Sequence, residues 1–398
     1  MIKIHAGQAL AAAALAVALG STAAAAKDIT VCLLAGKTGP LEAYAKQTEA
    51  GFMMGLEYLT KGTMKIGADS LKIIVKDDQL KPDRGKALLE ECYADDKADI
   101  AVGTSGSPIA LAMLPVAEEM KKVLIVEPAV ADSITGEKWN RYIFRTGRSS
   151  YQDALASAAA VPDGDVSIGM MALDTAFGRD GVAAFKAALA GVRPNAKVVV
   201  EEYAAGNTAD FTPFAERLFN GLKDKPGKKM IAFIWAGAHP IAKFVDMKPE
   251  RFGIGLAPGG NLLPVMAGWK GFAGAEGGIY YYHGFPKNAQ NDWLKAEYQK
   301  RFNAPPDFFV AGGFAAAAAV VAGLEKAGST DTEKLIAALE GLSFETPKGT
   351  MTFRKEDHQA LQDMYHWRIK QGATDTDLLE LVATIPAATM PLPIRNKR

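Results

Sequence analysis

Residues 100–128 read IAVGTSGSPIALAMLPVAEEMKKVLIVEP, and this stretch decides the fold. The apolar run Ile100–Val102 has the length of a buried strand, and a polar loop follows it. Ser107 and Pro108 then begin a predicted helix, because proline is favoured in the first turn. A second strand-like run, Val123–Val126, closes the unit. The stretch therefore predicts a β–α–β unit of a parallel sheet.

The same alternation extends in both directions and restarts after Arg145, which predicts an α/β fold with two lobes. Further predicted strands are Ile29–Leu34, Leu71–Val75, Val166–Ala172, Val198–Val200 and Ile231–Trp235, and predicted helices are Ala45–Leu59, Pro82–Asp95, Gly181–Ala190 and Phe211–Leu222. The alanine run 315–319 is flanked by large apolar residues and predicts a close-packed helix. Open parallel sheets bind ligands at the carboxyl ends of their strands, so the cleft between the lobes is the expected site.

The first 26 residues have the features of a secretory signal. Lys3 and His5 precede an apolar core at Ala9–Leu19, and small residues lead to Ala26. These features predict export of a soluble chain, with the signal peptide cleaved near Ala26. No cysteine stands at the predicted cleavage point, so a lipid anchor is not expected there, and no later apolar run is expected to cross a membrane.

Charge and cysteine content narrow the possible functions further. The 398 residues contain 45 acidic and 45 basic residues, so no bulk charge favours nucleic acid or an anionic membrane. The chain has two cysteines, Cys32 on a predicted strand and Cys92 in a predicted helix. An exported protein enters an oxidising compartment, where the two cysteines can form a disulfide. Alternatively, they can remain two buried thiols. The sequence leaves both alternatives open, since it does not give their separation.

Signatures of enzymes are absent from the sequence. It contains no H-E-x-x-H, G-x-S-x-G, Walker loop or C-x-x-C motif, and its histidines lack metal-ligand spacing. We therefore expect neither catalytic residues nor a metal or other cofactor.

Two loops at one edge of the first predicted sheet resemble anion receptors. The loop 103–108 precedes a helix, whose free N–H groups and hydroxyls favour a carboxylate. The loop 128–132 follows the neighbouring strand. The alternative is that Ser107 only caps the helix.

The order of these features resembles the periplasmic solute-binding proteins that serve ABC importers of the branched-chain amino-acid type. The segments that carry the resemblance are Thr38–Pro40 with Tyr44, Gly103–Ser107, Phe144–Thr146, Asp174 with Phe177 and Gly178, Asp210–Thr212, Gly237–Pro240, and Thr346–Thr350 with Phe353, Asp357 and Gln359. The resemblance covers nearly the whole predicted mature chain. It implies two Rossmann-like α/β lobes joined by three crossovers, which close on a ligand without chemistry.

The resemblance also implies lobe boundaries and partners. Lobe 1 is expected to comprise residues 27–148 and 283–355, and lobe 2 residues 149–282 and 356–398. The expected partners are a small ligand and a membrane permease, with no nucleic acid, and the expected state is a monomer.

Carried over by position, the family pattern assigns the ligand contacts. Ser107 is expected to bind a ligand carboxylate together with the backbone of Ala129. Tyr44 and Phe177 are expected to face the ligand from opposite lobes, and Phe309 to close the apolar side.

Departures from the amino-acid pattern indicate a different ligand. Ala131 replaces a hydroxyl residue and Gly259 replaces an acidic residue, both of which would meet an α-ammonium group. An ammonium group without acceptors in a closed cleft costs several kcal/mol, so a carboxylate lacking it is expected. Trp235 and Tyr151 suit a larger, aromatic ligand. Arg148 either contacts the carboxylate or forms a salt bridge in the hinge.

Three alternatives to this reading remain. The chain could bind a branched-chain or other amino acid, through ammonium partners at positions that the motifs do not align. The same two-lobed fold could serve as the sensing domain of a receptor, although such a protein normally carries a membrane span or signalling segment. An exported hydrolase is the third alternative.

Overall fold

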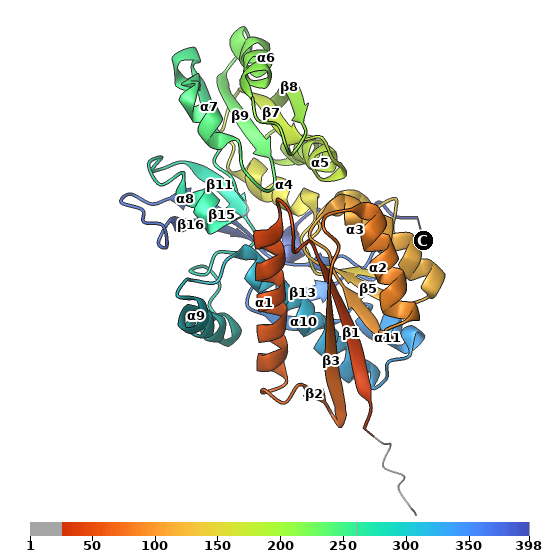
Figure 1. The fold of residues 1–398 in the computed structure, drawn as a ribbon. Helices are drawn as coiled ribbons and strands as arrows, with labels where there is room; N and C mark the ends of the chain where they lie inside the picture. Colours follow the sequence, from red (N-terminus) through yellow and green to blue (C-terminus); the bar gives the residue numbers. More distant parts are fainter. Residues whose placement is uncertain (1–25, 261, 398) are drawn as a thin grey trace, which may run out of the picture.

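The computed structural model describes residues 26–260 and 262–397. The predicted signal peptide up to residue 25 therefore lies outside the described residues. Two parallel-sheet lobes lie one above the other, with the amino-terminal lobe below in Figure 1. The two-lobed α/β fold predicted from the sequence is confirmed.

Lobe 1 is built on a sheet with the order β2-β3-β1-β4-β5-β6, parallel throughout except for the short edge strand β2. Its strands are β1 (Asp28–Ala35), β2 (Lys65–Ile66), β3 (Asp69–Asp77), β4 (Ile100–Val102), β5 (Val123–Val126) and β6 (Ile143–Arg145). The strands β4, β5 and β6 are buried along their whole length, as expected for a parallel sheet covered on both faces.

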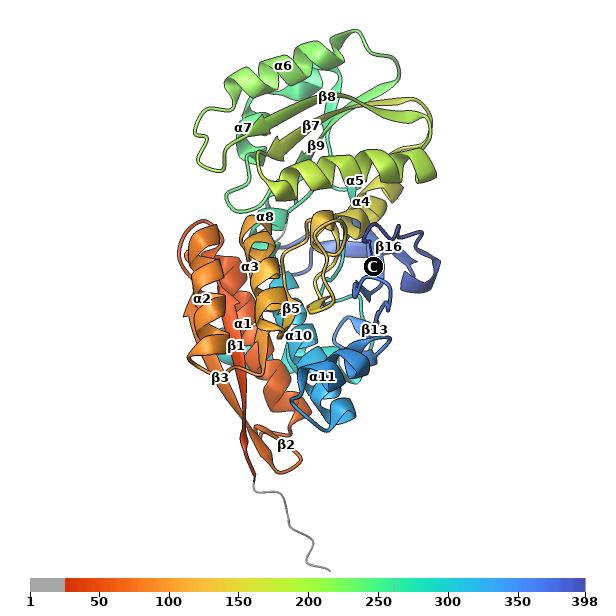
Figure 2. The ribbon, with the colours of Figure 1, turned by 90° about the vertical axis from the view of Figure 1, so that its right-hand side faces the viewer.

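Helices cover both faces of this sheet. They are α1 (Glu42–Leu59), α2 (Pro82–Ala94), α3 (Ser107–Met120), α10 (Phe308–Ala327) and α11 (Thr332–Leu339). Figures 1 and 2 place α1 and α10 on one side of β1 and β3, and α2 and α3 on the other. The amino-terminal end of α3 consequently lies at the edge of lobe 1 that faces lobe 2.

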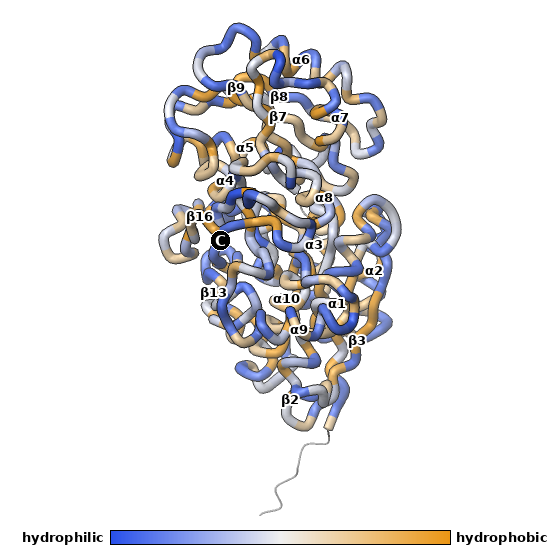
Figure 3. The backbone as a smooth tube through the Cα atoms, turned by 90° about the vertical axis from the view of Figure 1, so that its left-hand side faces the viewer, coloured by the Kyte–Doolittle hydropathy of each residue, from blue (hydrophilic) through white to orange (hydrophobic). Residues whose placement is uncertain are grey.

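Lobe 2 is built on a smaller parallel sheet with the order β10-β9-β7-β8. Its strands are β7 (Val166–Leu173), β8 (Ala196–Ala204), β9 (Lys228–Ile234) and β10 (Ile254–Leu256). The helices of this region are α4 (Ser150–Ala159), α5 (Ala176–Val192), α6 (Thr212–Lys223), α7 (Ile241–Asp246) and α8 (Leu263–Ala267), with the 3-10 turn η2 (Pro249–Phe252). The 3-10 turn η1 (Asp132–Ile134) lies between β5 and β6 of lobe 1. In Figure 3 the loops at the outer end of lobe 2 are mostly hydrophilic, as expected for exposed connections.

The carboxy-terminal third adds two small antiparallel sheets that the sequence analysis did not predict. One has the order β11-β15-β16 and the other β12-β13-β14. Their strands are β11 (Glu276–Ile279), β12 (Ser343–Thr346), β13 (Gly349–Phe353), β14 (Ala360–Leu361), β15 (Met364–Ile369) and β16 (Leu379–Ile385), and α9 (Ala289–Phe302) and η3 (Ala387–Thr389) complete the elements. Because β11 pairs with β15, the chain end returns to the region between the lobes.

The helix α10 corrects one expectation about membranes. The helix has 20 residues, and an 18-residue window within it has a mean hydropathy of 1.8, so by length and composition it could cross a bilayer. The sequence analysis expected no such run after the signal. In the structure 89% of its apolar window is buried, and it packs against α1. Gly313 and Gly51 allow this close approach, since an added Cβ would lie 2.0 and 1.9 Å from backbone oxygens of the facing helix. It is a core helix of lobe 1.

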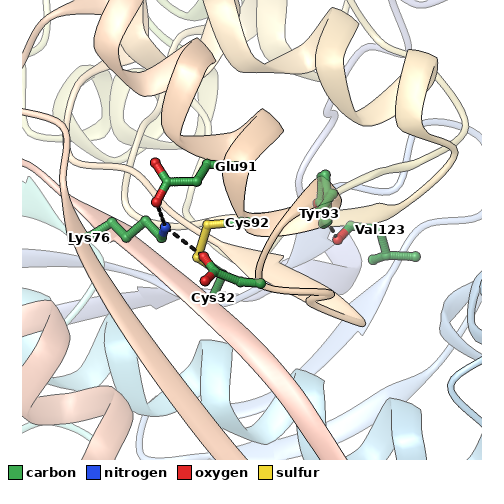
Figure 4. Close-up of a disulfide and its surroundings, with 7 residues drawn as sticks. Cys32, Lys76, Glu91, Cys92, Tyr93 and Val123 are labelled. Carbon is green, nitrogen blue, oxygen red and sulfur yellow. Dashed lines mark hydrogen bonds and ion pairs between the residues drawn. A yellow bond between two sulfur atoms is a disulfide. The ribbon is translucent and has the colours of Figure 1, made fainter.

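The two cysteines form a disulfide, which the sequence left open. Cys32 of β1 and Cys92 of α2 are bonded across a separation of 60 residues, and both are fully buried (Figure 4). Close by, Lys76 of β3 forms an ion pair with Glu91 of α2. The bond therefore joins the central strand of lobe 1 to a covering helix.

Candidate functional site

A cavity of about 220 Å³ opens between the two lobes and brings together several residues predicted to bind the ligand. The predicted residues that line it are Tyr44, Ser107, Ala129, Arg148, Phe177 and Phe309. The rest of its lining includes Leu41, Leu80, Ser105, Pro128, Val130, Leu173, Thr175, Ala236 and Ala238. The carboxyl ends of β5 and β7 and the start of α3 thus meet at one space, as open parallel sheets predict.

Ser107 is the first residue of α3 and does not cap it. The N-cap is Gly106, and no side chain of the described residues makes a capping bond there. The Ser107 Oγ instead accepts the backbone N–H groups of Val130 at 3.3 Å and Ala131 at 3.1 Å. The capping alternative is wrong, because the hydroxyl is turned toward the neighbouring loop. Its own proton can therefore be donated to an anion in the cavity.

Arg148 is both a salt-bridge partner and a cavity residue. Its Nε donates to both carboxylate oxygens of Asp153 at 3.1 Å, and its side chain is only 4% exposed. The guanidinium carbon lies 4.3 Å from the ring centre of Tyr280. Within residues 26–260 and 262–397, the Nη groups of Arg148 make no hydrogen bond to the protein. Arg148 can therefore form the salt bridge with Asp153 through Nε and still have its Nη groups available for a ligand carboxylate.

The capping box at the start of α4 fixes the partner of Arg148. The Ser149 side chain accepts the Gln152 N–H, and the Gln152 side chain accepts the Ser149 N–H. This arrangement satisfies two free donors and sets the helix entry. Asp153, in the first turn, is thereby directed at Arg148. Burial alone would lower the pKa of Arg148, but Asp153, Tyr280 and Glu127 together raise that pKa above its usual value, so the guanidinium stays charged.

Two further buried ionisable groups, Glu127 and Lys348, interact electrostatically with Arg148, and sequence reasoning missed the role of both. Glu127 accepts a hydrogen bond from Thr146 Oγ1 at 2.9 Å, and burial raises the pKa of its carboxyl. Lys348 donates from Nζ to Gln362 at 2.7 Å, and burial lowers its pKa to about 8. An acidic residue directly after a buried strand was the available signal for Glu127. Lys348 lies in the segment Thr346–Thr350 that carried part of the resemblance, but no role was assigned to its side chain.

Aromatic side chains form the apolar walls of the interlobe cavity. Tyr44 of α1 stacks on Phe309 of α10, with ring centres 4.2 Å apart and planes inclined by 22°. The Tyr44 hydroxyl also accepts the backbone N–H of Gly237 from lobe 2 at 3.0 Å. Phe177, at the start of α5, is half-buried and lines the cavity from lobe 2. The cavity is therefore bounded by aromatic rings from both lobes.

The other predicted site residues lie outside this cavity. Ala131 is fully buried behind it, where its carbonyl accepts Arg145 Nη1 at 2.6 Å. Tyr151 lines a small surface pocket beside Arg395. Trp235 and Gly259 line a second, adjacent cavity. Their assignment as ligand contacts stays a prediction.

The charged lining of the interlobe cavity is positive. Arg148 is a cation in its lining, and no acidic side chain lines it among the residues that the structure describes. Its other polar groups are hydroxyls, such as those of Ser105, Ser107 and Thr175, and backbone groups. The cavity is thus suited to bind an anion with an apolar body.

Comparison with known proteins finds relatives over most of the chain. A family model described as periplasmic binding protein matches residues 28–374. A Pseudomonas aeruginosa protein named leucine-, isoleucine-, valine-, threonine-, and alanine-binding protein is 26% identical over 381 residues, or 92% of this chain and 96% of that protein.

Solved structures from Rhodopseudomonas palustris are also similar. One, described as an ABC-type branched-chain amino acid transporter, is 60% identical with a TM-score of 0.81 and covers 93% of this chain and 100% of its own. Another, a solute-binding protein of an ABC transporter in complex with 3,4-dihydroxybenzoic acid, is 26% identical with a TM-score of 0.74, covering 90% and 98%.

Proposed function

We propose that this chain, which belongs to the periplasmic binding protein family, captures a small apolar or aromatic carboxylate without an α-ammonium group in its interlobe cavity. The family predicted from the motifs is confirmed. The chain is a periplasmic solute-binding protein of an ABC transporter and has a non-enzymatic role. It binds a small ligand and delivers it to a transporter permease.

The charge of the cavity lining carries the proposal on the ligand. Arg148 and the Ser107 hydroxyl can together bind a carboxylate, through charge-assisted and neutral hydrogen bonds. A buried ammonium group would need acceptors of comparable strength. No carboxylate lines the cavity among the described residues, and Arg148 would repel a second cation. A simple carboxylate therefore matches the lining better than a zwitterion.

Relatives point in two directions about the ligand. The 26% identical solute-binding protein was solved with an aromatic acid, 3,4-dihydroxybenzoic acid. The curated relative is named for binding leucine, isoleucine, valine, threonine and alanine. The stacked Tyr44–Phe309 pair and Phe177 support an aromatic or branched apolar body in this chain. The amino-acid alternative lacks a carboxylate in the described lining to receive the ammonium group.

For lobe closure, we propose the boundaries given by the family resemblance. Lobe 1 would comprise residues 27–148 and 283–355, and lobe 2 residues 149–282 and 356–398. The passage from β6 to α4 and the return after β11 support them. We likewise propose that the signal peptide is cleaved near Ala26, which mass spectrometry of the exported protein tests.

A thermal-shift screen tests the proposed ligand class. A ligand that binds the folded state raises its apparent stability by mass action. We expect benzoate-type and branched aliphatic acids to raise the melting temperature, and leucine, valine and alanine to have little effect. A screen in which only zwitterionic amino acids raise it would refute the proposal.

A further inference from the structure

A second cavity, of about 120 Å³, adjoins the interlobe cavity and lies among α4, α5, β9 and β11. Phe177 lines both cavities. Arg148 lines the first, and its partner Asp153 lines the second. The Tyr280 ring, against which Arg148 stacks, also lines the second. The two spaces therefore adjoin at these side chains.

The lining of the second cavity is mainly apolar and aromatic. Its large apolar members include Met170, Phe185, Phe233, Ile234, Trp235 and Phe308. An apolar protein cavity of about 150 Å³ is large enough to bind benzene. The second cavity is of comparable size, and the flexible Met170 can adapt its lining. Its size and chemistry suit a single ring.

Gly259 leaves the second cavity open without a need imposed by packing. A Cβ at this position would meet no heavy atom within 4 Å, and the backbone there is not in the left-handed region. Neither steric crowding nor backbone conformation therefore requires glycine. Gly259 lines the second cavity, so a larger side chain is sterically possible at this position of its lining.

Polar groups in this lining are neutral or already paired. The Tyr280 hydroxyl is buried and has no hydrogen-bond partner within the described part of the chain. His239 accepts the Ile241 N–H through Nδ1 at 3.1 Å, and burial lowers its pKa to about 4, so it is neutral at pH 7. Asp153 is paired with Arg148, and Glu276 with Arg368. The space therefore suits an uncharged group.

We infer that the second cavity is a subsite for the distal ring of an elongated carboxylate, an arylalkanoate, whose carboxylate lies at Ser107 and Arg148. The inference rests on the proposed function of the interlobe cavity and narrows its substrate class. Phe177, shared by both cavities, would contact the chain that joins the carboxylate to the ring.

A ligand series tests the subsite by calorimetry on the mature protein. Benzoate, 3-phenylpropanoate and 4-phenylbutanoate differ in the length between carboxylate and ring. Each buried methylene gives on the order of fourfold in affinity. We expect wild-type affinity to rise by at least about tenfold from benzoate to the best of the longer acids.

Variants that fill the second cavity complete the test. Ser157→Leu and, independently, Ala160→Leu extend side chains from cavity-lining positions of the α4 segment. Ala183→Leu, on the exposed face of α5, is the matched control. We expect both filling variants to abolish the rise in affinity from benzoate to the longer acids and to keep benzoate affinity within about twofold of wild type. The control variant should keep the rise in affinity.

The outcomes separate this inference from the function on which it rests. The subsite alone is overturned if benzoate binds and the longer acids bind no more tightly. It is also overturned if the rise in affinity persists in a filling variant that unfolds cooperatively. Absence of binding by every acid in the series overturns the proposed function and the subsite together.

Discussion

At residue scale, the Ser107 hydroxyl links the two loops that border the interlobe cavity. It accepts the N–H groups of Val130 and Ala131 while it stands at the first turn of α3. Both N–H groups are therefore satisfied without the ligand, and the hydroxyl proton remains to be donated. The loops are thereby organised for a carboxylate before it arrives, which lowers the cost of ordering on binding.

Replacement of this serine has two separable effects. We predict that Ser107→Ala weakens carboxylate binding roughly tenfold to hundredfold, through loss of a charge-assisted bond of about 1.5–3 kcal/mol. It should also lower the free energy of unfolding by about 1–3 kcal/mol, because two buried N–H groups lose their acceptor. Calorimetry and denaturant unfolding measure the two effects.

Ser167→Ala provides the control for this variant. Ser167 lies on β7, and its hydroxyl donates to the Pro226 carbonyl at 2.8 Å. Because Ser167 does not line the interlobe cavity, loss of this hydroxyl should lower stability and leave ligand affinity unchanged. Native affinity in Ser107→Ala would refute the role of the serine and the register from which the other contacts were inferred.

The directions of the side chains at the site could not be predicted from the sequence. Adjacent positions direct their side chains to different spaces: Ala236 lines the interlobe cavity and Trp235 the second. A family register places a residue near the cleft but does not give side-chain direction. The S-x-x-Q pattern of Ser149 and Gln152 marks the capped start of α4 in the sequence, but it does not show that Asp153 pairs with Arg148. Glu127 and Lys348, which are distant in sequence, interact electrostatically only in the folded chain.

At the scale of elements, most strands and several helices of the two parallel-sheet lobes could be predicted, because apolar strands alternate there with amphipathic helices. The short strands β2 and β10 and the helices α4, α7 and α8 were not predicted. The small antiparallel sheets could not be predicted either. Residues 276–279 of β11 pair with 365–368 of β15, so the partner of each is distant in sequence. The strand β16 reads LELVATI and is mostly apolar but mostly exposed, so its composition did not reveal that it pairs with β15.

The disulfide between β1 and α2 should contribute strongly to stability. Closing a loop across 60 residues restricts the unfolded chain by about 4 kcal/mol in the chain-entropy model. We predict that the double variant Cys32→Ala/Cys92→Ala loses stability of this order in urea unfolding. Reducing agent should destabilise the wild type but not the variant. Equal unfolding curves for the two proteins under oxidising conditions would contradict the prediction.

At whole-molecule scale, hydrogen bonds join the lobes around the cavity. Tyr44 of α1 accepts from Gly237, and Ser133 of η1 donates from N and Oγ to Asp180 of α5 at 3.0 and 2.8 Å. A ligand that contacts both lobes would favour this arrangement over a more open one. We predict a smaller radius of gyration in solution scattering when an acid from the screen saturates the protein.

Asp180→Ala separates closure from ligand contact. Asp180 does not line the interlobe cavity, but its loss removes both bonds to Ser133. We expect affinity to fall by several-fold as the open form gains population. A radius that stays unchanged at saturation in the wild type would rule out closure on the ligand.

The central claim is that the interlobe cavity accepts a carboxylate and disfavours an α-ammonium group. The most direct measurement is calorimetry with two matched ligand pairs, 3-phenylpropanoate against L-phenylalanine and 4-methylpentanoate against L-leucine. Each pair differs only in the ammonium group. Because an unpaired buried ammonium costs several kcal/mol, we predict that each acid binds at least about 100-fold more tightly than its amino acid. Tighter binding of L-leucine or L-phenylalanine than of its matched acid would contradict the account.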